Sequence, residues 1–193
     1  MVKVSRRTPG FTIVELLIVI IVIAILAAIV IVAYNGVQAS AQDSRTRNAA
    51  QQLETAIRTW GLNTGQRPLG GWSSTVAVNA SGNCSDGTGG WIFAGAYTCS
   101  LEDMLRSQNL IPANFTRSSF TPNTAYSSSV KDGSQSVMFY PCGTNTGKYG
   151  LFWYVANQTA DDAASLTSVE SQGCPSGPRT TYMMRAARLI DFN

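Results

Sequence analysis

An uninterrupted apolar run near the N-terminus constrains this 193-residue chain more than any other feature. Leu16 to Ala33 is eighteen consecutive apolar residues, rich in Leu and β-branched side chains. As a helix rising about 1.5 Å per residue, the stretch from Phe11 to Tyr34 measures roughly 36 Å, more than a hydrocarbon core of about 30 Å. A single segment that crosses lipid must be helical, because its backbone has to satisfy its own hydrogen bonds. The run therefore predicts one membrane-spanning helix.

The charges beside this run predict its orientation. The formal net charge is +3, and Lys3, Arg6 and Arg7 account for all of it, because the other 11 basic residues balance the 11 acidic ones. Basic residues before a span favour a cytoplasmic N-terminus, so the rest of the chain is expected to cross the membrane. Near-neutrality after the leader argues against a nucleic-acid-binding scaffold, which normally shows a basic stripe. Nucleic acid as a partner therefore has no support in the sequence.

The chain contains no histidine. This removes the commonest general base and the commonest nitrogen ligand of metals. Neither a Ser-His-Asp nor a Cys-His catalytic arrangement can be built, and we expect no enzyme, no cofactor and no metal site.

A short motif bridges the basic leader and the apolar run. The leader ends in Gly10, Phe11 follows, and Glu15 stands four residues later, just before the apolar residues. A boundary carboxylate could simply reach the lipid headgroups, but an ionisable residue in a membrane helix more often marks a functional contact. Residues 10–16, between a basic leader and an apolar helix, resemble the N-terminus of type IV pilins and of the pseudopilins of type II secretion. The resemblance covers about residues 5 to 60.

The resemblance implies specific roles for three residues. A prepilin peptidase would cut between Gly10 and Phe11 and methylate the new N-terminus at Phe11. Glu15 would attract the N-terminal amine of a neighbouring subunit. Two unit charges about 4 Å apart attract by about 4 kcal/mol at an effective dielectric near 20, and an unpaired carboxylate in an apolar bundle is strongly penalised. Glu15 is therefore expected to set the register in which subunits dock.

The same resemblance implies a structural function. The chain would be a single-pass membrane protein with an extracytoplasmic head, and after assembly a subunit of an extracellular pilus used in motility, adhesion or DNA uptake. Its partners would be identical or related pilin subunits, the prepilin peptidase, the assembly machinery of the membrane, and lipid before assembly. One alternative is a pseudopilin of a type II secretion system.

A second alternative is a secreted soluble domain released from a signal peptide. Ala39-Ser40-Ala41 is a small-residue site at which a signal peptidase could cut. Two features count against this hypothesis. The apolar run is longer than the usual 7–15 residues of a signal peptide, and Glu15 at its start would be unexplained.

The sequence predicts an α+β, pilin-like fold with a long N-terminal helix and a small antiparallel β-sheet head. Its expected parts are a cleaved leader (1–10), a membrane and filament-core helix (11–35), an amphipathic helix half packed on the head (36–62) and a globular head (63–193). The amphipathic half shows apolar residues at three- and four-residue spacing: Ala49, Leu53, Ala56, Ile57 and Trp60. We expect a bend at Gly36, the first helix breaker, and the helix end at Gly65 and Pro68.

The head is expected to contain one short helix and three strands. The pattern predicts a helix over 101–109, strands over 136–140, 149–155 and 180–185, and a turn over 143–147. Residues 161–169 fit either a surface turn or a short helix. Glu54 and Arg58 are four residues apart on the long helix, so we expect them to pair.

Four cysteines lie beyond the apolar run: Cys84, Cys99, Cys142 and Cys174. An even number in an exported domain favours disulfides, and three pairings can be drawn. We favour Cys84–Cys99 and Cys142–Cys174, because each closes one loop-rich segment, and the second resembles the C-terminal disulfide loop of many pilins. Free buried thiols are the alternative.

Three further groups of residues could form a binding site, but an ordinary structural role is favoured for each. Gly143 to Lys148 hints at a phosphate-binding loop, but its spacing is one residue short and Tyr149 replaces the expected Ser or Thr. A hairpin turn is favoured instead. Asp161 and Asp162 could hold calcium, although adjacent surface acids are the simpler interpretation. Arg185 and Arg188 could touch DNA or a neighbouring subunit, and an exposed face is favoured.

Overall fold

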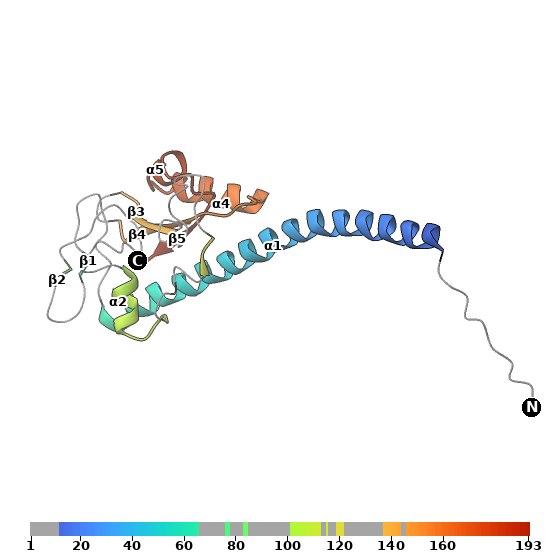
Figure 1. Ribbon diagram of the computed structural model, residues 1–193. Coiled ribbons are helices and arrows are strands. Elements are labelled where there is room, and N and C mark those ends of the chain that lie inside the picture. The colour runs from blue at the N-terminus through green and yellow to red at the C-terminus, as the bar shows by residue number, and fades with distance from the viewer. Residues whose placement is uncertain are drawn as a thin grey trace, which may run out of the picture. The chain divides into compact units, whose positions relative to one another are not determined.

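The computed structural model describes residues 12–65, 76–77, 83–84, 101–112, 115, 119–121, 137–143 and 146–193. The chain divides into two compact units, an N-terminal unit of residues 1–39 and a C-terminal unit of residues 40–193. The first element is a long helix that starts at Ile13, and a small antiparallel sheet lies in the C-terminal unit (Figure 1). This is the α+β, pilin-like fold that the sequence predicts.

Helix α1 runs without interruption from Ile13 to Thr64, a total of 52 residues. It contains Gly36, the expected helix breaker, as a regular helical residue. The helix ends where the sequence predicts, because Gly65 adopts a left-handed conformation with φ +65°. Its backbone N–H donates to the carbonyl of Gly61 at 2.9 Å. A glycine in this conformation is a common helix C-terminus, since it has no Cβ to clash.

Three antiparallel strands form the main sheet, in the order β3-β4-β5. They are β3 (Val137–Pro141), β4 (Lys148–Trp153) and β5 (Ala186–Asp191). The turn between β3 and β4 is the predicted hairpin: the N–H of Cys142 donates to the carbonyl of Lys148 at 2.8 Å, and Gly143 and Gly147 have φ of +78° and +69°. A separate pair joins β1 (Val76–Ala77) to β2 (Asn83–Cys84).

The predicted third strand over 180–185 is wrong. Residues Gly177–Thr180 form the short helix α5, with Pro178 near its start, and β5 begins only at Ala186. The sequence of β5 opens with two alanines, which have a low strand propensity. Pairing of Ala186 with Trp153 of β4, together with the burial of both residues, overrides that local preference.

Two other helices refine the prediction. Helix α2 (Leu101–Ser107) is shorter than the expected 101–109, because Asn109 has a positive φ of 56° and cannot continue it. Residues Ala160–Ser171 form a full helix, α4, where the sequence left a choice between a turn and a short helix. Ser100, the residue immediately before α2, lies outside the described residues.

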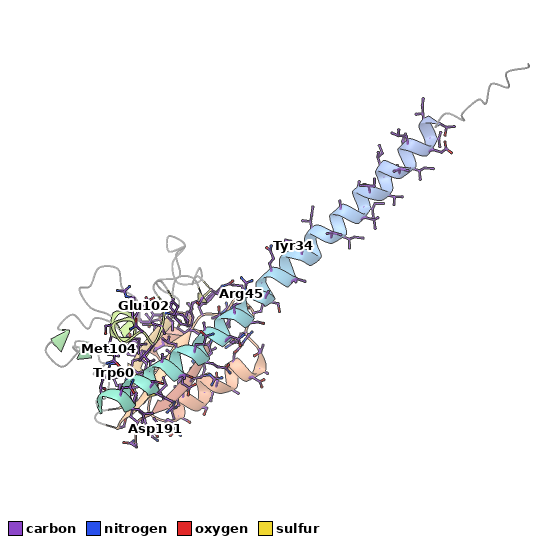
Figure 2. The ribbon with its side chains drawn as sticks, turned by 90° about the horizontal axis from the view of Figure 1, so that it is seen from below. Tyr34, Arg45, Trp60, Glu102, Met104 and Asp191 are labelled. Carbon is purple, nitrogen blue, oxygen red and sulfur yellow. A yellow bond between two sulfur atoms is a disulfide. The ribbon has the colours of Figure 1, made fainter. Side chains whose placement is uncertain are left out.

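The sheet carries one hydrophobic cluster on each face. Val137, Phe139, Leu151 and other residues pack with the buried face of α1 and with α2, and this cluster includes Trp60 and Met104, labelled in Figure 2. The opposite cluster joins the sheet to α4 through Met138, Tyr140, Phe152, Leu166, Val169 and Met184. Neighbouring residues of β3 thus point to opposite faces, as the two-residue repeat of a strand requires. Leu53 and Ile57 of α1 are fully buried in this core.

Candidate functional site

Glu15 of the N-terminal motif forms a capping box with Thr12 at the start of α1. Its Oε2 atom accepts hydrogen bonds from the backbone N and from the Oγ1 of Thr12, both at 2.8 Å. In return, the backbone N of Glu15 donates to Thr12 Oγ1 at 3.2 Å. A reciprocal box of this kind satisfies N–H groups that the first turn of a helix leaves without partners. The charge of Glu15 alone does not predict this box, but the Thr-x-x-Glu spacing of residues 12–15 is a signal for it.

Gly10 and Phe11, the predicted cleavage and methylation residues, lie outside the described residues. The description begins at Thr12, the residue immediately after Phe11. The roles of Gly10 and Phe11 therefore stay predictions.

The rest of the N-terminal unit presents an apolar surface. The large apolar side chains from Ile13 to Ile31 for which burial is described are between 48% and 85% exposed, and they stand out around the helix in Figure 2. Helix α1 is long and apolar enough to cross a membrane. Contiguous exposed apolar surface larger than a few hundred Å² marks a contact with a membrane or another protein. Either environment would cover this surface.

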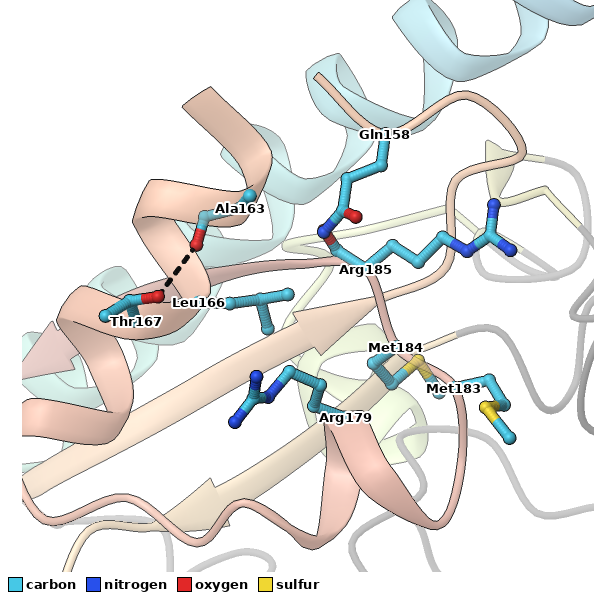
Figure 3. Close-up of a pocket in the computed structure, with 8 residues that line it drawn as sticks. All are labelled: Gln158, Ala163, Leu166, Thr167, Arg179, Met183, Met184 and Arg185. Carbon is cyan, nitrogen blue, oxygen red and sulfur yellow. Dashed lines mark hydrogen bonds between the residues drawn. The ribbon is translucent and has the colours of Figure 1, made fainter. Parts of the chain in front are cut away.

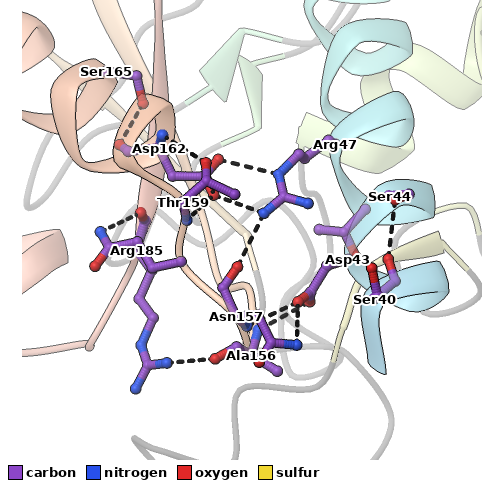
Figure 4. A network of polar contacts seen from close by, with 12 residues as sticks. Ser40, Asp43, Ser44, Arg47, Ala156, Asn157, Thr159, Asp162, Ser165 and Arg185 are labelled. Atoms are coloured by element: carbon purple, nitrogen blue, oxygen red, sulfur yellow. Dashed lines mark hydrogen bonds and ion pairs between the residues drawn. The ribbon is translucent and has the colours of Figure 1, made fainter. Parts of the chain in front are cut away.

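A second capping box lies in the C-terminal unit, at the start of α4. Asp162 Oδ2 accepts from the backbone N and from the Oγ1 of Thr159, both at 2.9 Å, and the N of Asp162 donates to Thr159 Oγ1 at 3.2 Å. The guanidinium of Arg47 on α1 reaches the same carboxylate, with Nη2 2.7 Å from Oδ2 and Nε 3.2 Å from Oδ1. Figure 4 shows Arg47 pointing across to Asp162.

These contacts shift the pKa of both partners. Burial works to raise the pKa of Asp162, but the hydrogen bonds from Arg47 and Thr159 outweigh it, so the pKa lies below its usual value. The hydrogen bond to Asp162 raises the pKa of Arg47. The two aspartates considered for calcium therefore have different environments. Asp162 binds Arg47 and so links α4 to α1, while Asp161 is exposed. Among the described residues no group of three or more His, Cys, Asp or Glu side chains is placed to hold a metal.

Asp43 on α1 is a buried carboxylate that the sequence did not single out. It is only 1% exposed. Its Oδ1 accepts from the backbone N of Ala156 at 2.9 Å, and its Oδ2 accepts from the backbone N and the Nδ2 of Asn157 at 2.8 and 3.2 Å (Figure 4). The donors belong to the loop after β4, more than 110 residues away in the chain, so no local pattern could have indicated this contact.

The predicted pair of Glu54 and Arg58 is confirmed and is part of a larger group. Arg58 Nε lies 3.1 Å from Glu54 Oε1, and Arg188 Nη1 of β5 lies 3.0 Å from Glu54 Oε2. Arg58 also donates to the carbonyls of Asp191 and Leu189 on β5, at 2.9 and 3.3 Å. Among the described strands β5 pairs only with β4, so Arg58 covers the other edge of β5.

Arg185 and Arg188, for which an exposed face was expected, are partly exposed, and both are also held by contacts within the chain. Arg188 binds Glu54, as above. Arg185 Nη1 donates to the carbonyl of Ala156 at 2.7 Å, and its guanidinium carbon lies 5.4 Å from the centre of the Tyr154 ring. Both guanidinium groups therefore bind other residues of the C-terminal unit.

The disulfide Cys142–Cys174 is confirmed. It joins the end of β3 to the segment after α4, and both cysteines are buried. The Cys84–Cys99 pairing cannot be followed, because Cys99 and the side chain of Cys84 lie outside the described residues.

A pocket of about 330 Å³ lies beside α4 and α5. Figure 3 shows Leu166, Met183 and Met184 on its walls together with Arg179 and Arg185. Its polar groups are largely engaged: Arg179 Nε binds Glu170 Oε1 at 2.9 Å, and Gln158 Nε2 donates to the carbonyl of Arg185 at 2.7 Å. The pocket offers no arrangement of acid, base or nucleophile among these residues.

Comparison with known proteins bears on the N-terminal motif. Residues 5–31 match the family model of the prokaryotic N-terminal methylation motif. A type IV major fimbrial protein FimA of Dichelobacter nodosus is 40% identical over 78 residues, which is 39% of this chain and 49% of that protein. A fimbrial protein of Neisseria meningitidis serogroup B is 38% identical over 71 residues, 37% of this chain and 42% of that protein.

These matches cover part of each protein: the chain spans about half or less of the length of these relatives. No solved structure matches the chain. The resemblance seen in the sequence is nevertheless confirmed: the chain carries the N-terminal methylation motif of prokaryotic pilins and is similar to type IV fimbrial proteins.

Proposed function

We propose that this chain is a structural subunit of a type IV pilus, inserted in the membrane, processed by a prepilin peptidase and polymerised into an extracellular filament. The observation that carries the proposal is the exposed apolar helix of the N-terminal unit, which begins at the Thr12–Glu15 box. The methylation motif and the similarity to fimbrial proteins support the same function, and only the similarity to fimbrial proteins favours a pilus over a secretion pseudopilus.

The helix suits two successive environments. In the membrane, lipid covers its apolar side chains, with the N-terminus on the cytoplasmic side because of the basic leader. In the filament, the helices of neighbouring subunits cover them instead. The contact between subunits is heterologous and does not close, because a fibre grows only when the same step repeats indefinitely.

Cleavage after Gly10 supplies the charge that Glu15 needs. The new amine of Phe11 is positive, and in an apolar bundle it finds its partner in the carboxylate of a neighbouring subunit. A helix docked out of register leaves Glu15 buried without a cation, which typically costs about 3–5 kcal/mol. Apolar packing holds the filament together and the ion pair selects its register.

The test compares wild type with Glu15→Ala in cells that express the full chain. We expect the variant to insert and to be cleaved like wild type, but to yield far less protein in sheared fibre preparations. Asp161→Ala, at an exposed acid of the C-terminal unit, is the control and should assemble normally. Wild-type amounts of fibre from Glu15→Ala would contradict the proposed role. If wild-type cells form no fibres, and cells that lack this chain lose secretion, the pseudopilin is favoured.

A further inference from the structure

We propose that the C-terminal unit carries a contact between copies of this chain, in which Leu62 of one copy enters the Met183 pocket of the next. The Met183 pocket is the hollow of about 330 Å³ beside α4 and α5 whose walls include Leu166, Met183 and Met184 (Figure 3). The inference rests on the proposed function, because polymerisation places a second copy beside the first. The residues that carry it all belong to the C-terminal unit.

Leu62 and Met183 are exposed, although large apolar side chains of this unit are otherwise covered. Leu62 is 86% exposed near the end of α1, and Met183 is 47% exposed between α5 and β5. Among the described residues of the C-terminal unit, these are the only large apolar side chains that are exposed. A single exposed apolar residue needs no explanation, but here one of the two lies beside a hollow that has room for the other. Docking would remove both from water.

The Met183 pocket is apolar and its rim is fixed. Leu166 and Met184 on its walls are 2% and 1% exposed. Met183 has a φ of 56°, in the left-handed region that residues other than glycine seldom adopt. The next residue is held in place, because the backbone N of Met184 donates to the carbonyl of Pro178 at 3.0 Å. The pocket is therefore formed before docking, and a partner does not have to order the loop around it.

The polar groups around the pocket favour an apolar occupant. Arg179 Nε is bound to Glu170 Oε1, and Gln158 Nε2 donates to the carbonyl of Arg185. Arg185 in turn donates through Nη1 to a backbone carbonyl of the loop after β4. A polar ligand would compete with these contacts, whereas an aliphatic side chain such as leucine requires no hydrogen-bond partner.

Leu62 and the pocket lie toward opposite ends of the part of α1 that packs in this unit. One wall of the pocket is formed by the first turns of α4, which Arg47 of α1 binds through Asp162. Leu62 lies 15 residues beyond Arg47, which is about 22 Å at a helical rise of about 1.5 Å per residue. For copies in parallel orientation, joining the two ends advances each copy along the helix. Such a contact is heterologous and does not close a ring, as a fibre requires.

Cysteine cross-linking in fibres tests this contact directly. The full-length double variant Leu62→Cys/Met183→Cys is recovered in sheared fibres, treated with a short bis-maleimide and separated on a denaturing gel. We expect a ladder of multimers, because each copy is then joined to the copy before it and the copy after it. Each single variant alone should stay monomeric, and co-expression of the two single variants should give dimers and nothing longer. Wild type treated in the same way controls for the native cysteines.

A charge at position 62 should weaken assembly without unfolding the unit. We expect Leu62→Asp to lower the fraction of processed subuntis that enters fibres about tenfold or more, as for the lost burial of a leucine side chain. Asn63→Asp places the same charge at the adjacent exposed position, so it is the matched control and should stay within about twofold of wild type. Both variants should unfold in urea like wild type, because both side chains are exposed.

Three outcomes overturn the inference while leaving the proposed function intact. One is a double variant that forms fibres but gives no ladder, and shielding of Met183→Cys from maleimide in that case would assign the pocket to another partner. The second is a dimer from either single variant alone, which would indicate an isologous contact. The third is an equal fibre yield from Leu62→Asp and Asn63→Asp, and this comparison decides alone if the double variant forms no fibres. If wild type forms no fibres, the proposed function falls as well.

Discussion

The carboxylate of Asp43 on α1 receives both the backbone N–H and the side-chain Nδ2 of Asn157, at 2.8 and 3.2 Å. Asp43 also accepts from the N–H of Ala156. The loop that follows β4 is thereby fixed to α1 by a buried acid whose oxygens are all occupied. Arg47, one turn further along α1, donates to the carbonyl of Asn157 and to Asp162, so two neighbouring turns of the helix hold the same loop.

We predict that Asp43→Ala destabilises the C-terminal unit by about 1–3 kcal/mol, because it leaves the partly buried N–H donors of Ala156 and Asn157 without their acceptor. Urea unfolding of the full chain in detergent measures the change. Asp161→Ala, in which an exposed carboxylate is removed, is the control and should cost less. Equal losses in the two variants would show that the Asp43 contacts contribute little.

Acid should weaken the link between α4 and α1. The pKa of Asp162 lies below its usual value, so its contribution to stability is fully present above the unfolded-state pKa of about 3.9 and is lost as the pH falls through the lower folded pKa. We expect wild-type stability to drop as the pH is lowered below about 4, and expect Arg47→Met to lose less in this range. Unfolding measured between neutral and strongly acidic pH tests this, and identical slopes for the two proteins would contradict it.

Arg58 and Arg188 share Glu54, but only Arg58 also covers the edge of β5. Arg58→Met removes the donors to the carbonyls of Leu189 and Asp191, so we predict a loss of about 1–3 kcal/mol and a tendency of the protein to self-associate through the open edge. Arg188→Met removes only a partly exposed ion pair and should cost about 0–1 kcal/mol. Size-exclusion chromatography and urea unfolding in detergent distinguish them, and indistinguishable variants would argue against edge protection.

The Cys142–Cys174 bridge should contribute strongly to stability. Cys142→Ser is expected to lower the free energy of unfolding by about 2–5 kcal/mol, and adding Cys174→Ser should cost little more, because the bridge is already lost. Reductant should lower the melting temperature of wild type toward that of the variants. A melting temperature that does not respond to reductant would contradict this prediction.

The parts of the fold that local chemistry determines were predictable. The apolar run and the glycine at position 65 gave the extent of α1 to within a few residues, and the glycines at 143 and 147 gave the hairpin. The cysteine pair 142 and 174 followed from count, loop closure and the resemblance. These features depend on a few neighbouring residues or on strong single-residue preferences.

The contacts that were missed depend on tertiary structure. Strand β5 begins with alanines that favour helix, and its place is set by pairing with β4. The contacts of Asp43, Arg185 and Arg188 could not be predicted, because their partners lie far away in the chain. The two Thr-x-x-acid boxes are different, because each depends on a local spacing that can be seen in the sequence.

In the proposed function, cleavage after Gly10 creates a cation that the carboxylate of Glu15 binds within a filament. Mass spectrometry of the subunits recovered from sheared surface fibres tests it most directly. We expect a mature chain that begins with N-methyl-Phe11. Fibres whose subunits keep residues 1–10, or a mature chain that begins at Gln42, would contradict it.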